Sequence, residues 1–261
     1  MAEKLNRPRV GLALGGGVVR GMAHVGVLEV LLGAGIPIDI VAGTSVGAVI
    51  GAVFAAGRDV AEIAYIVRKI RWRDIARPVW PRRGLLSFAP LERTLVRLLG
   101  VLTFAQLTHP FAAVCTDMRT GRQVVISEGR VAPAVRASAS VPGIVTPLEV
   151  GPYLLADGAI VNNTPASVVR EMGADYVIGV DIMAPDFLRA AGPLGLGFMA
   201  LEIAIANSGT GRAYSEVFIS PQLGGLTYIL FSERETLIEH GREAATAAIP
   251  EIRHALGLEP V

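Results

Sequence analysis

The sequence predicts an α/β fold, a three-layer sandwich in which helices cover both faces of a mainly parallel central sheet. Residues 10–14 and 36–42 are short apolar runs, and each is followed by a turn of small residues and a helical pattern. A third apolar run, at 176–181, lies much later in the chain. Strands that alternate with helices are typical of parallel sheets, because parallel neighbours need a long crossover connection.

The first elements follow in chain order. Residues 10–14 are entirely apolar and end in three glycines, which is typical of a buried strand that leads into a loop. Apolar residues spaced three and four apart predict a helix over 20–35, closed by glycine. Residues 36–42 predict a second strand, followed by a turn at Ser45 and a helix of small residues over 46–56.

The rest of the chain continues this pattern less regularly. Turn-forming residues at 118–121 separate two strand-like runs, which predicts a hairpin. We expect a βα unit after Asp157 and a C-terminal helical segment at about 233–257, broken at Pro250. The other expected elements are helices at 60–70 and 91–99, strands at 111–116, 123–127 and 176–181, and a proline- and arginine-rich connection at 71–84.

Composition limits the class of protein. Of the 261 residues, 52% are hydrophobic and 18% are charged, so the chain can bury one large core. We expect a single domain over 1–261, with its core motifs at about 9–182. The 24 basic and 23 acidic side chains give a net charge of +1, which predicts no nucleic-acid partner. The single cysteine, Cys115, excludes an intrachain disulfide and a thiolate-rich metal site.

Two stretches bear on localisation. Residues 1–9 are charged and lack the apolar core of a signal peptide. The longest uncharged run, between Asp39 and Arg58, is interrupted by glycines and a turn signal, unlike a membrane-spanning helix. Because a single cysteine also fits a reducing compartment, we expect a cytoplasmic protein, with peripheral contact at the inner membrane face as a further expectation.

The pentapeptide Gly43-Thr44-Ser45-Val46-Gly47 lies between the second apolar run and the helix that follows it. A serine on such a strand-to-helix turn is held in a strained conformation that only small neighbours permit, and its hydroxyl projects at the edge of the sheet. With 30 glycines in the chain, the bare pattern also fits a loop serine beside two helix-packing glycines. Its position favours a nucleophile that forms an acyl-enzyme.

The glycine loop Gly15-Gly16-Gly17 follows the first apolar run, whose end should lie beside the end of the second. Its N–H groups are therefore candidates to stabilise an oxyanion. A dinucleotide-binding loop is the competing interpretation. It is disfavoured because Arg20 stands where the third glycine of that motif belongs, and no acidic residue is well placed for the ribose.

The base that activates the serine must be an Asp, Glu or His. Asp157 ends the apolar run 153–156 and opens an Asp-Gly turn, which places a carboxylate at the end of a strand. By itself an Asp-Gly pair is also an ordinary turn. The chain has four histidines, His24, His109, His240 and His254. Three lie in expected helices and His109 precedes a proline, so each is by default a packing or surface residue.

Together these motifs resemble the patatin-like phospholipase family, in particular its bacterial single-domain members. The glycine loop, the serine pentapeptide, the segment Arg136–Gly143 and the Asp-Gly-Ala turn occur in the order of that family over most of the chain. The resemblance implies a patatin-like fold with a nucleophile elbow between the second strand and its helix, and a Ser-Asp dyad without histidine. It assigns the nucleophile to Ser45, the base to Asp157, the motif glycines to Gly43, Gly47 and Gly158, and the oxyanion loop to Gly16, Gly17, Val18 and Arg20.

Val18 departs from the family pattern, which usually has glycine at this position. A β-branched residue resists the positive φ values that glycine allows, so a left-handed backbone here would distort the oxyanion site. With an ordinary backbone, Val18 would still donate its N–H group while narrowing the pocket. Both alternatives are compatible with the sequence.

The resemblance implies a serine acyl hydrolase that cleaves the carboxylic esters of phospholipids or lysophospholipids and needs no cofactor. The chain offers no dense carboxylate loop for calcium, so we expect no metal. One alternative is an α/β-hydrolase esterase with a Ser-Asp-His triad, because His240 and His254 follow Asp157; it is disfavoured because Ser45 arrives after only one βα unit. Another is a catalytically weak lipid-binding or scaffold protein, because of Val18.

The segment Arg68–Arg83 contains seven basic side chains and one acid, with Trp72 and Trp80 interleaved. This composition suits an anionic lipid surface, and equally a solvated face with two half-buried aromatic rings. The apolar segment 187–206 is a candidate cover over an acyl pocket, although core packing is the more common use of such a segment. The sequence predicts no oligomeric state.

Overall fold

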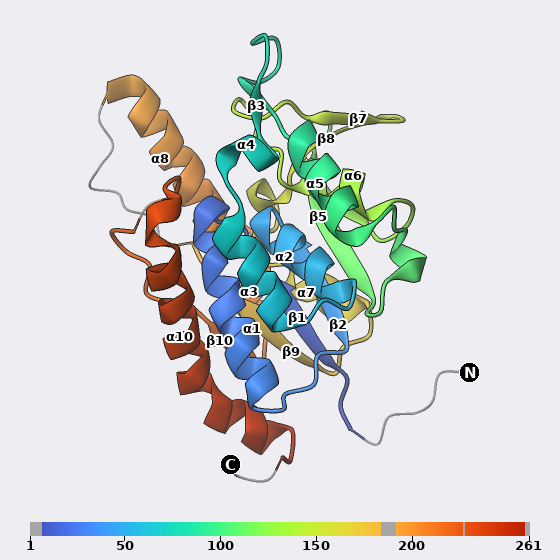
Figure 1. The fold of residues 1–261 in the computed structure, drawn as a ribbon, viewed down its shortest axis with the longest axis vertical. Helices are drawn as coiled ribbons and strands as arrows, with labels where there is room; N and C mark the ends of the chain where they lie inside the picture. The colour runs from blue at the N-terminus through green and yellow to red at the C-terminus, as the bar shows by residue number, and fades with distance from the viewer. Residues whose placement is uncertain (1–6, 184–191, 227, 259–261) are drawn as a thin grey trace.

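The computed structural model describes residues 7–183, 192–226 and 228–258, and within them eight strands form one mixed sheet (Figure 1). The strands are β1 Val10–Leu14, β2 Ile40–Thr44, β5 Phe111–Asp117, β6 Arg122–Ile126, β7 Leu148–Val150, β8 Tyr153–Asp157, β9 Tyr176–Val180 and β10 Val217–Ile219. Their order is β10-β9-β1-β2-β5-β8-β7, with β6 paired to β5 beside this path.

The sheet is mainly parallel, as expected. Strands β10, β9, β1, β2 and β5 run in one direction, whereas β6 and β8 are antiparallel to β5, and β7 is antiparallel to β8. A separate two-stranded ribbon joins β3 (Arg77–Pro78) and β4 (Leu86–Ser87). The hairpin at 111–126 is confirmed, because β5 and β6 pair directly.

Helices cover both faces of the sheet. One face is covered by α1 (Ala23–Gly33), α2 (Val46–Ala55), α3 (Val60–Lys69) and α10 (Arg234–Ala255). The other is covered by α7 (Ala166–Glu171), beside which α9 (Gly211–Tyr214) lies. The remaining helical elements are η1 Val18–Met22, α4 Trp72–Ile75, α5 Ala89–Leu99, η2 Phe104–Gln106, α6 Val131–Ser138, η3 Gly158–Ile160, α8 Gly192–Ala206 and η4 Phe231–Glu233.

Strand β1 shows why the sheet is covered on both sides. Leu12 and Leu14 belong to the larger core cluster under α1, whereas Ala13 belongs to the smaller cluster under α7. Successive side chains of a strand point to opposite faces, so a strand covered on both faces is apolar throughout. Gly11 allows α7 to approach closely, because a Cβ there would collide with Val169.

Several expected elements differ in the structure. The helix expected over 20–35 is η1 followed by α1, and the expected connection at 71–84 contains α4 and β3. The second strand, expected at 36–42, is β2 at Ile40–Thr44, because its pairing with β1 begins only where Ile40 lies opposite Gly11. The expected break at Pro250 is wrong, since α10 continues through it. Buried Ala245 and Ile252 anchor the helix on both sides of the proline, and this packing outweighs the local loss of a backbone hydrogen bond.

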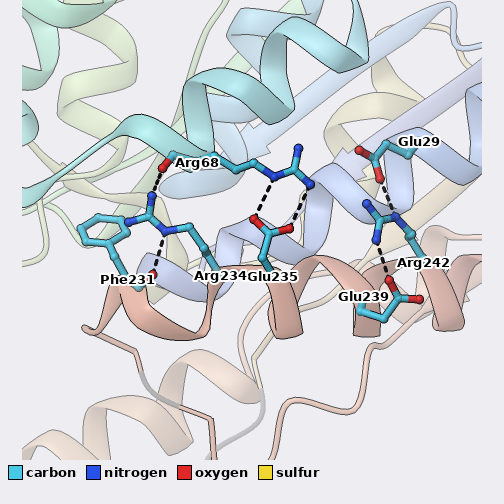
Figure 2. A network of polar contacts seen from close by, with 7 residues as sticks. All are labelled: Glu29, Arg68, Phe231, Arg234, Glu235, Glu239 and Arg242. Atoms are coloured by element: carbon cyan, nitrogen blue, oxygen red, sulfur yellow. Dashed lines mark hydrogen bonds and ion pairs between the residues drawn. The ribbon is translucent and has the colours of Figure 1, made fainter.

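Polar contacts join α10 to the neighbouring helices α1 and α3 (Figure 2). Arg68 of α3 pairs with Glu235 at 2.8 Å. Arg242 pairs with Glu29 of α1 at 2.6 Å and with Glu239 of α10 at 2.5 Å. The C-terminal helix is thus fixed to α1 and α3 by charge as well as by apolar packing. None of the helices described is both long and apolar enough to cross a bilayer.

Candidate active site

Ser45 occupies the turn between β2 and α2. Its φ of 56° and ψ of −124° make it one of two non-glycine residues with positive φ in the described part of the chain. A Cβ at Gly43 would collide with the carbonyl of Gly47, and a Cβ at Gly47 would collide with the carbonyl of Leu14. Both motif glycines are therefore required by close backbone approach, and the strained turn has the geometry of a nucleophile elbow.

Ser138 fixes the Ser45 turn to the neighbouring strand. The Ser45 N–H donates to the Ser138 Oγ at 3.0 Å, and that hydroxyl donates to the carbonyl of Val114 in β5 at 2.6 Å. Ser138 is fully buried at the end of α6. The sequence did not predict this positioning role, because Ser138 was considered only as part of the motif at 136–143.

Asp157 ends β8, and its backbone is held on both sides. Its carbonyl accepts a hydrogen bond from Thr116 at 2.8 Å, and its N–H donates to the carbonyl of Ser140 at 2.9 Å. The carboxylate accepts the N–H of Ala159 at 2.9 Å. The motif glycine Gly158 lets the following turn rest directly on β5, because a Cβ there would collide with a carbonyl of that strand.

The Asp157 carboxyl group is buried and its pKa is raised. The residue is only 3% exposed, and burial raises the pKa of the carboxyl group to about 6. Hydrogen bonds from the Ser45 hydroxyl and the Ala159 N–H partly oppose this rise, because they favour the charged form. The carboxylate is thus mostly ionised at pH 7 and is more basic than an ordinary aspartate.

The glycine loop lies against the serine. A Cβ at Gly16 would stand 3.0 Å from the Cβ of Ser45. The Gly16 N–H donates to Asn163 Oδ1 at 3.0 Å, and the amide of Asn163 donates to Asp181 at 3.3 Å. Gly16 therefore shapes the site without offering a free N–H group. Asn163 is a further positioning residue that the sequence did not reveal, although it follows the Asp-Gly-Ala turn closely.

The remaining oxyanion candidates are Gly17 and Val18. Among the described residues, no acceptor is found for either N–H group, and both residues line the cavity that contains Ser45 and Asp157. Val18 has a φ of 53°, so the left-handed alternative is the one that occurs. The strain expected for a β-branched residue therefore falls on Val18, and the next residue, Val19, donates its N–H group to the carbonyl of Tyr228 at 3.2 Å.

Arg20 has a different place from the one expected. Its N–H donates to the carbonyl of Gly17 at 3.1 Å, within η1. Its fully buried guanidinium donates to the carbonyl of Leu226 at 2.6 Å and lies 3.5 Å from the ring centre of Tyr228. Arg20 lines neither cavity described below, so the expectation that it binds the oxyanion is corrected. Its side chain holds Leu226 and Tyr228 beside η1.

His24 of α1 contacts the glycine loop through its side chain. Its Nε2 lies 2.8 Å from the carbonyl of Gly15, and the side chain is fully buried in α1. Burial lowers the pKa of the imidazole to about 4, so the ring is neutral at pH 7 and donates its Nε2–H to that carbonyl. The sequence suggested only a packing role for this residue.

An inner cavity of about 130 Å³ begins at Ser45 and extends between α2, α3 and α5. Its walls are apolar side chains, apart from Ser45 and Thr94. Trp72 and Phe231 close one side, with their rings 5.4 Å apart, and the Trp72 indole N–H donates to the carbonyl of Ile229 at 2.8 Å. This space suits an aliphatic chain.

An outer cavity of about 340 Å³ contains Ser45, Asp157 and the glycine loop. Of the segment expected at 187–206, residues 187–191 lie outside the described part of the chain, and the rest forms α8. Leu201, Glu202 and Ile205 of α8 line this cavity. Three residues line both cavities: Val18, Ser45 and Val141.

No histidine lines either cavity in the described part of the chain. His240 pairs with Glu243 at 3.1 Å on α10, and His254 lies exposed near the end of that helix. His109 stacks on Phe54. The residues needed for a Ser-Asp-His triad are therefore not brought together. No cluster of metal-ligating side chains occurs among the described residues either.

A strained serine after β2, a buried carboxylate at the end of β8 and a glycine loop after β1 form the arrangement expected of a serine hydrolase site. The model of the patatin-like phospholipase family matches residues 12–170. The chain belongs to this family, and membership supports the hydrolysis of lipid esters.

Relatives of known sequence agree with this assignment. An uncharacterized NTE family protein of Mycobacterium tuberculosis is 39% identical over 178 residues, which are 67% of this chain and 49% of that protein. Patatin-like phospholipase domain-containing protein 7 of Rattus norvegicus is 34% identical over 196 residues, 71% of this chain and 14% of that protein. The chain spans about half the length of the mycobacterial relatives it matches.

Solved structures share the fold at low sequence identity. VipD from Legionella pneumophila aligns with a TM-score of 0.66 and 12% identity, over 94% of this chain and 67% of VipD. Human GIVD cytosolic phospholipase A2 aligns with a TM-score of 0.51 and 13% identity, over 98% of this chain and 60% of that protein. These similarities bear on the fold alone.

Proposed function

We propose that this protein is a serine acyl hydrolase of the phospholipase A or lysophospholipase type, with Ser45 as nucleophile and Asp157 as base. The observation that carries this proposal is the strained Ser45 turn beside a buried carboxylate whose pKa responds to the Ser45 hydroxyl. Both residues open into one cavity, where a substrate carbonyl can reach them.

In the first step, the Ser45 Oγ attacks the ester carbonyl carbon while Asp157 takes the hydroxyl proton. The carbonyl oxygen becomes an oxyanion, for which the N–H groups of Gly17 and Val18 are the available donors. The tetrahedral intermediate then collapses and breaks the bond to the alcohol oxygen. Asp157 returns the proton to that oxygen, so a neutral alcohol or lysolipid leaves and an acyl-serine remains.

In the second step, water attacks the acyl-serine and gives its proton to Asp157. A second tetrahedral intermediate forms on the same donors, and its collapse restores the Ser45 hydroxyl with the proton from Asp157. A fatty acid is released, and no oxidant, reductant or metal takes part in this sequence. A raised pKa suits Asp157 to both directions of proton transfer.

The cavities suggest how a lipid ester would lie. The inner cavity is apolar and takes the acyl chain, whereas the outer cavity takes the alcohol portion. The structure of human GIVD cytosolic phospholipase A2 is a complex with a methyl γ-linolenyl fluorophosphonate inhibitor. A fluorophosphonate with an aliphatic chain is therefore a suitable probe for Ser45 in this protein.

Hydrolysis is tested with a panel of p-nitrophenyl esters, phospholipids and lysophospholipids, with the released fatty acid measured by mass spectrometry. We expect Ser45→Ala to lower kcat at least about a thousandfold. Ser127→Ala, at an exposed serine after β6, is the matched control and should match the wild type. Wild-type turnover by a folded Ser45→Ala variant would rule out the proposal. Absence of both hydrolysis and probe labelling in the wild type would favour the lipid-binding scaffold.

Membrane contact is proposed for the β3–β4 hairpin, which projects from the body of the molecule (Figure 1). Trp80 is 82% exposed near its tip, and Arg77 and Arg82 are exposed beside it. An interfacial tryptophan among cations suits an anionic lipid surface. The rest of the basic segment differs, because Arg68 pairs with Glu235 and Trp72 lines the inner cavity.

Liposome flotation tests this contact. Wild-type protein should float with vesicles that contain phosphatidylserine more than with phosphatidylcholine vesicles, because each cation near an anionic surface contributes about 1 kcal/mol. The double variant Arg77→Glu/Arg82→Glu should lose that preference and keep its hydrolysis of soluble esters. Equal flotation of the wild type with both vesicles would remove the proposal.

A further inference from the structure

Val18 stands at the junction of the two cavities. It lines the inner and the outer cavity together with Ser45 and Val141, and no other described residue lines both. Val18 begins η1, directly after the glycine loop, whereas Val141 follows α6. Two valines from different elements therefore lie with the nucleophile on the wall that the two cavities share.

The backbone of Val18 has a conformation that is unfavourable for valine. Its φ of 53° lies in the left-handed region, which a β-branched residue adopts at a cost that glycine avoids. Ser45 is the other described non-glycine residue with positive φ, and its strain belongs to the nucleophile turn. Glycine at position 18 would remove this strain. The presence of valine therefore indicates that the side chain has a role in the site.

The reaction geometry gives that side chain a use. An ester bound for attack has its carbonyl carbon at the Ser45 hydroxyl and its oxygen toward the glycine loop. Its acyl chain must then enter the inner cavity past Val18 and Val141, starting from the carbon next to the carbonyl. A methyl branch on that carbon would meet the valine side chains, whereas an unbranched chain has only hydrogens there.

We propose that Val18 is a specificity-determining residue that restricts the enzyme to acyl chains unbranched next to the carbonyl. This inference rests on the proposed hydrolase function and names the acyl class of the same site. Val18 and Val141 both line the inner and the outer cavity, and in this proposal their side chains narrow the entrance to the inner one. The depth of the inner cavity is set by residues farther from Ser45, so chain length and branching are selected at different places.

The test compares kcat/KM for p-nitrophenyl hexanoate and p-nitrophenyl 2-methylhexanoate. Wild-type protein should prefer the straight ester by at least about tenfold, as expected for one methyl group in a tight apolar site. Val18→Ala should lower this preference by about tenfold, and Val141→Ala should lower it as well. Val53→Ala removes the same atoms from a wall of the inner cavity only, and should leave the ratio unchanged.

The possible failures are distinguishable. A wild type that hydrolyses neither ester overturns the proposed function together with this inference. An active wild type with equal kcat/KM for the two esters, or an active Val18→Ala variant with the wild-type ratio, overturns this inference alone. If Val18→Ala does not fold in a thermal melt, Val141→Ala decides, because its backbone has ordinary φ; an unchanged ratio then contradicts the proposal.

Discussion

The active site and the face of α10 that meets α1 and α3, here called the α10 face, are held together in different ways. None of the ion pairs found among the described residues involves Ser45, Asp157 or the glycine loop, which are fixed by buried hydrogen bonds and close backbone contacts. On the α10 face, Arg68 and Glu235 form an ion pair with side chains 37% and 62% exposed.

This difference means that the active-site contacts serve activity at a cost in stability, whereas the α10 contacts add to stability. A buried carboxylate and a left-handed valine each cost folding free energy, and the rest of the molecule must compensate. Exposed ion pairs contribute little individually but are not strained. Substitutions at the active site should therefore cost activity while some of them raise stability, whereas substitutions on the α10 face should change stability slightly and leave activity intact.

The largest expected effect is that of Asp157→Asn. Loss of the base should lower kcat by about a thousandfold or more, because Asn accepts no proton. The same change should raise the free energy of unfolding at pH 8 by up to about 3 kcal/mol, since burial raises the pKa of Asp157 from 3.8 to about 6 and disfavours the charged form. Ester hydrolysis and urea unfolding measure the two effects.

The pH dependence of this stability gain has a definite sign. The unfolded carboxyl ionises near pH 3.8 and the folded one near pH 6, so the cost is full above pH 6 and disappears as pH falls toward 3.8. The advantage of Asp157→Asn should shrink over that range. Asp175→Asn, at an exposed residue directly before β9, is the matched control. A gain that is independent of pH would contradict the burial argument.

His24 should produce a dependence of opposite sign. Its pKa falls from 6.5 to about 4 on folding, so the stability that it provides above pH 6.5 is lost as pH falls from 6.5 to 4, by about 3 kcal/mol in total. His24→Gln, which keeps a donor for the Gly15 carbonyl, should not lose it. Urea unfolding at several pH values should show the variant gaining on the wild type below pH 6.5. A constant difference would mean that His24 does not titrate with folding.

A smaller effect is expected for Val18→Gly. Glycine relieves the left-handed strain at φ 53°, and we expect a net gain in unfolding free energy of about 1 kcal/mol. Val150→Gly, at an exposed strand residue without positive φ, is the matched control and should lose about 1 kcal/mol. Loss of stability in both variants would show that the packing of Val18 outweighs its strain.

The smallest effect is expected on the α10 face. Glu235→Gln should lower stability by only about 0.2–1 kcal/mol, because its ion pair with Arg68 is partly exposed. The difference from the wild type should fade in 1 M salt, and ester hydrolysis should not change. A loss of several kcal/mol would mean that the network of Figure 2 stabilises the fold cooperatively.

The sequence predicted the parts of the fold that depend on local pattern. The apolar runs predicted the parallel strands. The glycines around Ser45 predicted the strained turn, because only glycine fits where backbones approach this closely. It did not predict α10 continuing through Pro250, where contacts with a distant helix outweigh a local preference.

The supporting residues of the candidate site were beyond sequence reasoning. Ser138, Asn163 and His24 act through hydrogen bonds to backbone atoms of other elements, and only the assembled sheet brings these atoms together. The same is true of Arg20, which was expected at the oxyanion and instead holds the carbonyl of Leu226.

The most direct test of the account is intact-mass analysis after reaction with an aliphatic fluorophosphonate. If Ser45 is the nucleophile, the wild-type protein carries one adduct per chain. Peptide mapping locates this adduct on Ser45, and the Ser45→Ala variant lacks it. The labelling rate should rise with pH around a midpoint near 6 as Asp157 ionises, and Asp157→Asn should slow it strongly. An unlabelled wild type, or a Ser45→Ala variant that is labelled equally, would contradict the assignment of Ser45 as the nucleophile.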